Sequence, residues 1–186
     1  MSGAQTYFKV LDADGSTIYA DSSWGLPRGD KPGRWEKAKG ELVVCKNGLH
    51  LCRREDLIHW LGPRIFEAEV GGGKLIESDQ KVVVRKARLV RELDTWNDRT
   101  ARLFAADCAE RVLPLFEKKH TNDTRPREAI EAARAFADSA AYSAVRSAAD
   151  SAARSAADFA ADFAAYSAAR EWQTDRLFDY LEGRAS

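Results

Sequence analysis

The chain has 186 residues and no net charge, since 29 Lys and Arg are balanced by 29 Asp and Glu. It has no apolar run of the length that a membrane span requires, and its first residues form no hydrophobic signal segment. Non-specific binding of nucleic acid needs a surplus of basic residues, which this chain lacks. Three cysteines without a secretory signal predict reduced thiols, so we expect a cytoplasmic protein.

The first half of the chain reads as a β-rich module, residues 1–94. Short apolar runs separated by turn signals predict strands over residues 7–11, 17–19 and 64–70, and extended pieces over 75–93. A short helix is expected over residues 53–61, before Gly62 and Pro63, and a turn at residues 71–73. With a helical second half, residues 95–186, the fold class is α+β.

A cluster of chemically versatile side chains surrounds Asn47-Gly48. This dipeptide is a strong signal for a two-residue type I′ hairpin. Such a hairpin pairs Cys45 with His50, and it projects both of them and Cys52 to one face.

Three interpretations of Cys45, His50 and Cys52 remain open. Two cysteines on one face are typical of a buried core. The same three residues are candidate ligands of zinc, although no fourth ligand is evident in the sequence. His50 is also a candidate polar contact to a ligand, or a general base, but no second catalytic group stands at a suitable spacing. No cofactor other than zinc is indicated.

A loop of residues 25–40 follows the first strands. Trp24 and Trp35 flank the part of this loop that contains Arg28 and Arg34. Exposed aromatic side chains beside charges mark a binding surface, whereas tryptophans folded back over a sheet form a lid. We treat these four residues and His50 as candidate binding residues.

A run of basic residues occupies the last predicted strands, without an acid between them. It comprises Lys81, Arg85, Lys86, Arg88 and Arg91. Strands at sheet edges commonly carry Lys and Arg on a solvated face, and we interpret the run in this way.

After residue 95 the periodicity is helical. Thr95 and Asp98 resemble a capping arrangement, and Phe104, Cys108 and Val112 recur at helical spacing. We expect Pro114 to kink this helix. A second helix is expected to begin near Pro126, with Ile130, Ala133, Phe136 and Ala137 as its apolar stripe.

Residues 139–170 form an alanine-rich tetrapeptide repeat, in which Tyr142, Phe159, Phe163 and Tyr166 are the large side chains. Alanine favours helix, and alternating charges at every fourth position add supporting pairs. A repeat of four drifts around a helix of 3.6 residues per turn, so a long coiled coil is not expected. We expect the segment to break into antiparallel helices rather than form one rod, with Trp172, Leu177, Phe178 and Leu181 packing the last turns and Gly183 ending them. Small side chains also suit packing between two chains, so a homo-oligomer remains open.

The residues of the second half resemble a known family. The run from Trp96 to Pro114, the segment Pro126-Arg127-Glu128-Ala129-Ile130-Glu131 and the alanine-rich array are similar to the helical putative immunity proteins of bacterial and prophage genomes. The segment Cys45 to Cys52 and the short helix after it resemble an uncharacterised module of phage-encoded proteins. The resemblance implies a mobile-element setting, in which small proteins bind and block an enzyme of a host or competitor.

Two functions from different classes follow. The first is a non-enzymatic binding protein, an immunity or anti-defence inhibitor such as an anti-CRISPR, whose partner is a protein of the host or of a competing element. The second is an enzyme or metal-binding module in the first half that uses His50 with Cys45 and Cys52. The sequence favours the first, because it offers no second catalytic group and no phosphate-binding glycine loop.

Overall fold

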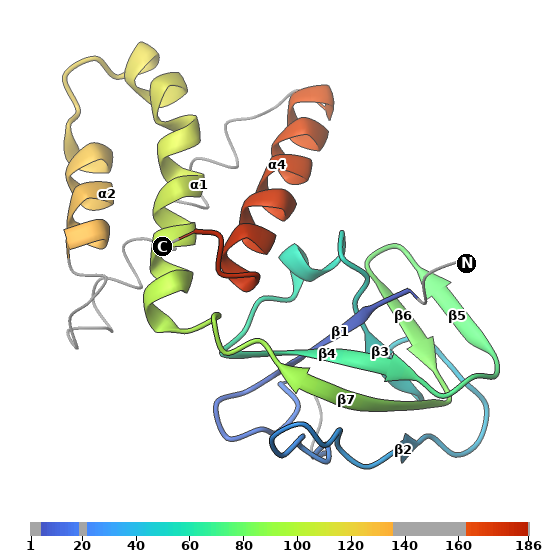
Figure 1. Cartoon of the computed structure of the whole chain (residues 1–186). Coiled ribbons are helices and arrows are strands. Elements are labelled where there is room, and N and C mark those ends of the chain that lie inside the picture. The colour runs from blue at the N-terminus through green and yellow to red at the C-terminus, as the bar shows by residue number, and fades with distance from the viewer. Residues whose placement is uncertain (1–4, 19–21, 136–162, 186) are drawn as a thin grey trace. The chain divides into compact units, whose positions relative to one another are not determined.

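The computed structural model describes residues 5–18, 22–135 and 163–185, with residues 163–167 described by their backbone alone (Figure 1). The chain divides into two compact units, Met1–Asp94 and Thr95–Ser186. All strands of the described residues lie in the first unit and end at Glu92, and three α-helices follow in the second. In this broad form the expected mixed fold, β-rich and then helical, is confirmed.

The β-rich unit contains two antiparallel sheets. One has the order β1-β4-β7-β2 and the other β3-β6-β5. Their bounds are β1 Tyr7–Leu11, β2 Glu36–Lys37, β3 Leu49–Leu51, β4 Arg64–Val70, β5 Leu75–Ser78, β6 Lys81–Val84 and β7 Lys86–Glu92. Phe8 and Cys52 exchange two backbone hydrogen bonds of 2.8 Å, which join β1 to the residue after β3.

Most of the expected strands are confirmed, but the one at 17–19 is not. Thr17 has no regular secondary structure and Ile18 lies in a turn, between Ser16 and Ser23, which form a single bridge. Tyr19 lies outside the described residues.

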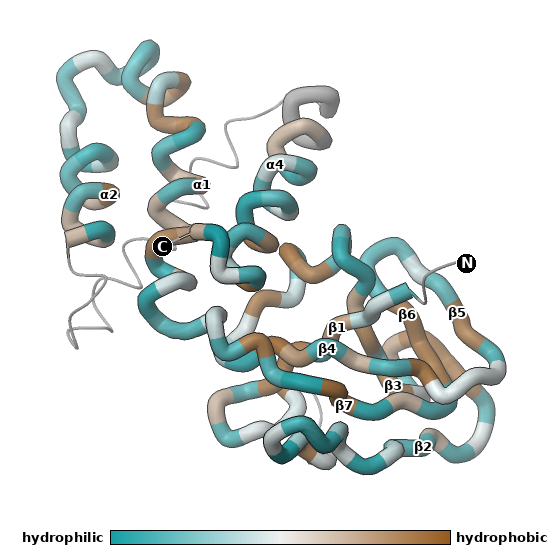
Figure 2. Tube along the Cα trace, in the orientation of Figure 1, coloured by the Kyte–Doolittle hydropathy of each residue, from teal (hydrophilic) through white to brown (hydrophobic). Residues whose placement is uncertain are grey.

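The core of this unit lies between the inner faces of its sheets. Alternate residues at the start of β7 are buried, as expected for a strand with one covered face, whereas β4 buries Phe66 and Ala68 on one face and also the adjacent Ile65. By contrast, β6 buries three consecutive valines, and Figure 2 shows it mostly in the hydrophobic colour. The buried cluster comprises Leu11, Trp24, Leu51, Phe66, Ala68, Val82, Val84, Ala87 and Leu89.

The predicted hairpin at Asn47-Gly48 is wrong. Val43 pairs with Asn47 around a turn in which Cys45 takes a φ of 63°, and β3 pairs with β6, placing His50 opposite Val83. In β6 the residues of β3 face three buried valines, whereas the predicted hairpin would have placed them opposite Lys46, Cys45 and Val44. Gly48 is needed for close approach, because a Cβ there would lie 2.2 Å from Cγ1 of Val83.

The helix expected over 53–61 is also too long. Only Leu57–His59 form a short 3-10 helix, η1. The buried Asp56 accepts hydrogen bonds from the backbone and side chain of Arg53, and these fix a turn in the residues before it. A carboxylate that bonds the backbone locally competes with helix formation.

The second unit contains α1 (Asp98–Lys119), α2 (Arg125–Ala135) and α4 (Phe163–Leu181). The N-cap of α1 is Asn97, not Thr95: its side chain accepts from the backbone N–H of Arg99 and Thr100. The α1 helix continues through Pro114 to Lys119. Pro126 lies in the first turn of α2, as predicted, and Gly183, at a φ of +69°, follows the end of α4.

The apolar positions expected on these helices are largely confirmed. The buried residues are Phe104, Cys108, Ile130, Ala133, Leu177, Phe178 and Leu181. Phe136, Ala137 and residues 139–162 of the tetrapeptide repeat, with Tyr142 and Phe159, lie outside the described residues. The last part of the repeat, residues 163–170, forms the start of α4.

Candidate protein-interaction site

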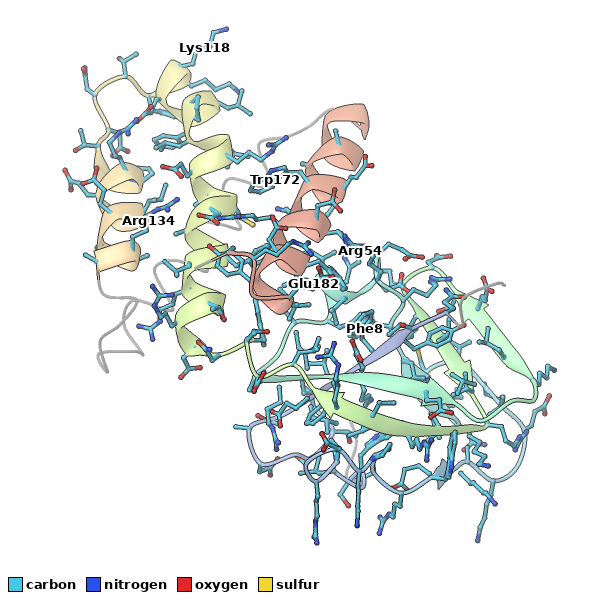
Figure 3. The ribbon with its side chains drawn as sticks, viewed as in Figure 1. Phe8, Arg54, Lys118, Arg134, Trp172 and Glu182 are labelled. Carbon is cyan, nitrogen blue, oxygen red and sulfur yellow. The ribbon has the colours of Figure 1, made fainter. Side chains whose placement is uncertain are left out.

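The helical unit has a polar centre at Asp107 of α1. Its carboxylate is buried and accepts hydrogen bonds from three side chains: Arg134 of α2 at 2.9 Å, Arg176 of α4 at 2.7 Å and the Tyr180 hydroxyl at 2.7 Å. Figure 3 shows Arg134 on the side of α2 that faces α1. One carboxylate therefore connects all three described helices.

Burial affects the Tyr180 hydroxyl beside Asp107. Desolvation, followed by the hydrogen bond to Asp107, raises the pKa of Tyr180 to about 12. Its hydroxyl consequently remains a donor at neutral pH. Aromatic packing continues this contact, because Phe104 meets Tyr180 and Trp96 edge-on, with ring centroids 6.3 Å and 6.0 Å away. These contacts fix the relative positions of α1 and α4.

An exposed patch lies on α1 and α4. Cζ of Arg111 lies 4.4 Å from the ring centroid of Trp172, and Trp172 is half-buried. Figure 3 shows Trp172 on the side of α4 toward α1. One turn along α1, Leu115 is 53% exposed. We call Arg111, Leu115 and Trp172 the Trp172 patch; it combines the aromatic and arginine side chains that dominate protein interfaces with an exposed leucine.

In the β-rich unit the two loop tryptophans have different environments. Trp24 is buried in the core, beneath Nζ of Lys9 at 5.4 Å from its ring centroid. Of the two alternatives, Trp24 therefore belongs to the lid. Trp35 is half-buried and lies against Lys86 and Arg88 of β7.

The two candidate arginines of the loop are both exposed. Arg28 lies in a turn that it closes with Lys31 through backbone bonds. Nε of Arg34 donates to Glu36 at 2.8 Å, and the same carboxylate oxygen accepts the backbone N–H of Gly25. Arg34 thus supports the loop beside Trp35, whereas Arg28 lies on a separate turn.

The structure separates the environments of Cys45, His50 and Cys52. Cys45 is exposed, and its backbone N–H donates to Nε2 of His50 at 3.1 Å. Cys52 is buried, and desolvation raises the pKa of its thiol to about 12. Desolvation, with the charges of Lys81 and Lys9, lowers the pKa of His50. The imidazole is thus neutral at pH 7 and accepts a backbone bond.

The described residues show no metal-binding group around these three side chains, and burial keeps the Cys52 thiol protonated at neutral pH. Within the described parts of the chain, no three His, Cys, Asp or Glu side chains are grouped so that they could hold a metal ion. A thiol with a raised pKa is a weak nucleophile at neutral pH, since the thiolate is the reactive form.

Two members of the basic run are paired across the sheet. Arg88 pairs with Glu69 at 2.7 Å and Arg91 with Glu67 at 2.6 Å, both across β4 and β7. Sequence reasoning missed this pairing and the Asp107 centre. The alternating Glu67 and Glu69 of the neighbouring strand were an available signal for the pairing with Arg88 and Arg91. No signal was available for the Asp107 centre, because its three partners are too distant along the chain.

The helical unit is thus a helix assembly organised around one buried carboxylate, with exposed charged surfaces. Residues 91–177 match the model of a family described as Imm-5 like putative immunity protein, so this part of the chain is similar to that family. The match confirms the family resemblance of the second half. No curated protein and no solved structure gives a match. None of the helices in the described residues has the length and apolar character needed to cross a membrane.

Proposed function

We propose that this chain is a non-enzymatic immunity protein that binds an effector protein and blocks its activity. The observation that carries the proposal is the match of residues 91–177 to the immunity protein family. The phage-like resemblance of the first half supports an origin in a mobile element. The effector then belongs to a competing element or to a host defence system, including CRISPR nucleases.

The Trp172 patch is the surface of the helical unit best suited to this task. Its three residues lie within the matched region. Interfaces depend on a few anchors that are enriched in Trp, Tyr and Arg. Arg111 already stacks on Trp172, so little side-chain freedom remains to be lost when a partner binds.

The chemistry of the first half supports binding rather than catalysis. The two cysteines and the histidine have distinct environments, with one thiol buried and the imidazole engaged with the backbone. An enzyme that uses these residues remains the alternative, and it has no independent geometric support.

Co-expression tests the proposed function. The chain is produced in bacteria together with the product of each gene that neighbours its own, and growth is measured. We expect one of these products to inhibit growth alone and to be neutralised by the chain, and the two to co-elute as a complex. If no toxic neighbour is neutralised or bound, the proposal is wrong.

Variants locate the contact. Leu115→Asp and Trp172→Ala should each lower the affinity roughly tenfold or more, as expected for anchor residues. Glu131→Gln, an exposed residue on α2, serves as the control and should bind normally. If all three variants bind the effector as tightly as the unmodified chain, the Trp172 patch is not the contact surface. The neutralisation experiment would still stand on its own.

A further inference from the structure

A basic and aromatic surface lies on the outer face of the first sheet, at the end formed by β2 and β7. Lys37 of β2 pairs with Lys86 of β7, so the two side chains share a face. Arg88 follows two residues later on the same face, and the intervening Ala87 is buried on the other. Trp35 immediately precedes β2. We call Trp35, Lys37, Lys86 and Arg88 the Trp35 platform.

The indole of Trp35 is held in place by close contacts. Nζ of Lys86 and Cζ of Arg88 lie 4.3 Å and 4.5 Å from the ring centroid. A Cβ at Gly71 would lie 2.8 Å from Cζ3 of Trp35 and 2.6 Å from Cδ of Lys86. The ring and the lysine stem thus pack directly on the backbone of Gly71. The platform is a fixed surface.

The platform carries positive charge that the sheet does not neutralise. Arg88 is paired with Glu69. Neither Lys37 nor Lys86 forms an ion pair with any carboxylate of the described residues. Lys37 is exposed and Lys86 is half-buried, so each of the two side chains has surface in contact with solvent. A ligand that supplies carboxylates beside a hydrophobic contact complements this surface in charge and in shape.

We infer that the Trp35 platform binds an acidic segment of a protein partner. Carboxylates of the partner pair with Lys37 and Lys86, and the contact of Lys86 with the indole holds its ammonium group in place for this. Nucleic acid fits less well, because the cations already stack on Trp35 where a base would stack. This surface lies outside the matched residues 91–177, so it is independent of the proposed immunity function.

Fluorescence anisotropy with the full chain tests the inference. The probe is a labelled peptide of alternating Glu and Gly, and an oligo-dT of equal length is the comparison. We expect salt-sensitive binding of the peptide that exceeds binding of oligo-dT. Lys37→Glu and the pair Lys86→Gln with Arg88→Gln should each weaken peptide binding roughly fivefold or more, the effect of losing accessible charge contacts.

A matched control separates this site from general charge effects. Lys118→Gln with Lys119→Gln removes the same charge at the end of α1, where Figure 3 shows Lys118 pointing outward, and it should leave binding unchanged. Lys37 is exposed and makes no ion pair within the described residues, so its variant is expected to fold even if the double variant does not. Absence of peptide binding, an equal loss in the control, or preference for oligo-dT would overturn the inference.

Discussion

Asp107 is the buried charged residue that connects the three described helices of the helical unit. It is buried, and two arginines and a tyrosine from other helices donate to it. Replacing this carboxylate by an amide removes the buried charge and one of its two acceptor oxygens, while Arg134 and Arg176 keep only their more exposed partners Glu110 and Asp179. An isolated charge or polar group in a protein interior is far more costly than an absent pair.

We therefore expect Asp107→Asn to destabilise the chain by about 2–3 kcal/mol, measured by urea unfolding and followed by circular dichroism. Glu110→Gln is the matched control. It also loses a contact to Arg134, but its side chain is 60% exposed, so the cost should stay below about 0.5 kcal/mol. Similar losses in both variants would show that the buried network contributes little.

The three cysteines should differ in reactivity. Desolvation raises the pKa of both Cys52 and Cys108 to about 12, so both thiols stay protonated and covered at pH 8, whereas Cys45 is exposed. We expect a thiol-specific reagent to modify one cysteine rapidly in the native chain and all three after denaturation. Mass spectrometry should place the first adduct on Cys45, and Cys45→Ser should abolish the rapid phase. Fast modification of Cys52 would contradict the pairing of Phe8 with Cys52.

At the scale of elements, the sequence predicts features that depend on nearby residues. The end of α4 at Gly183 is such a feature. A left-handed residue commonly follows a helix, and glycine adopts that conformation without help from distant parts of the chain. The register around Cys45 and His50 could not be predicted, because it depends on β6, more than thirty residues later in the chain. The candidate site follows the same rule: Trp35 was identified from its loop, but its contact with Lys86 and Arg88 requires the pairing of β2 with β7.

The pairing of β3 with β6 makes a prediction about glycine. Gly48 and Gly72 both have positive φ, but a Cβ at Gly48 would collide with Val83, whereas nothing lies within 4 Å at Gly72. Gly48→Ala should therefore lower stability by about 1–3 kcal/mol more than Gly72→Ala, because it adds overpacking to backbone strain. Thermal unfolding of the two variants measures the difference. Equal melting temperatures would contradict the pairing of β3 with β6 and would favour the hairpin predicted at Asn47-Gly48.

The cap of α1 makes a smaller prediction. The Asn97 side chain accepts from two backbone N–H groups, and Thr100 donates back to the carbonyls of Thr95 and Asn97 while accepting from the N–H of Asn97. Asn97→Ala should cost about 1 kcal/mol in unfolding free energy, the usual loss for such a cap. Asn97→Asp keeps an acceptor and should cost less. If both variants lose the same amount, the capping bonds are not the cause.

At the scale of the whole molecule, each unit has a core of its own. Residues 1–94 enclose the cluster around Leu11, Phe66 and Leu89, and residues 95–186 pack Ala106, Leu113 and Ile130 among their helices. A chain of about 90 residues buries enough apolar surface to fold alone. The two units therefore have separate sources of stability.

We expect a fragment of residues 1–94 to unfold in a single cooperative urea transition, with dispersed NMR signals before it. Gly48→Ala should destabilise this fragment by the same amount as it does the full chain, since mutational effects at independent sites add. Asp107→Asn should have its effect in the complementary fragment, residues 95–186, for the same reason. A first fragment without a cooperative transition would mean that the β-rich core is too small to fold alone. The Trp35 platform would then be a surface only of the complete chain.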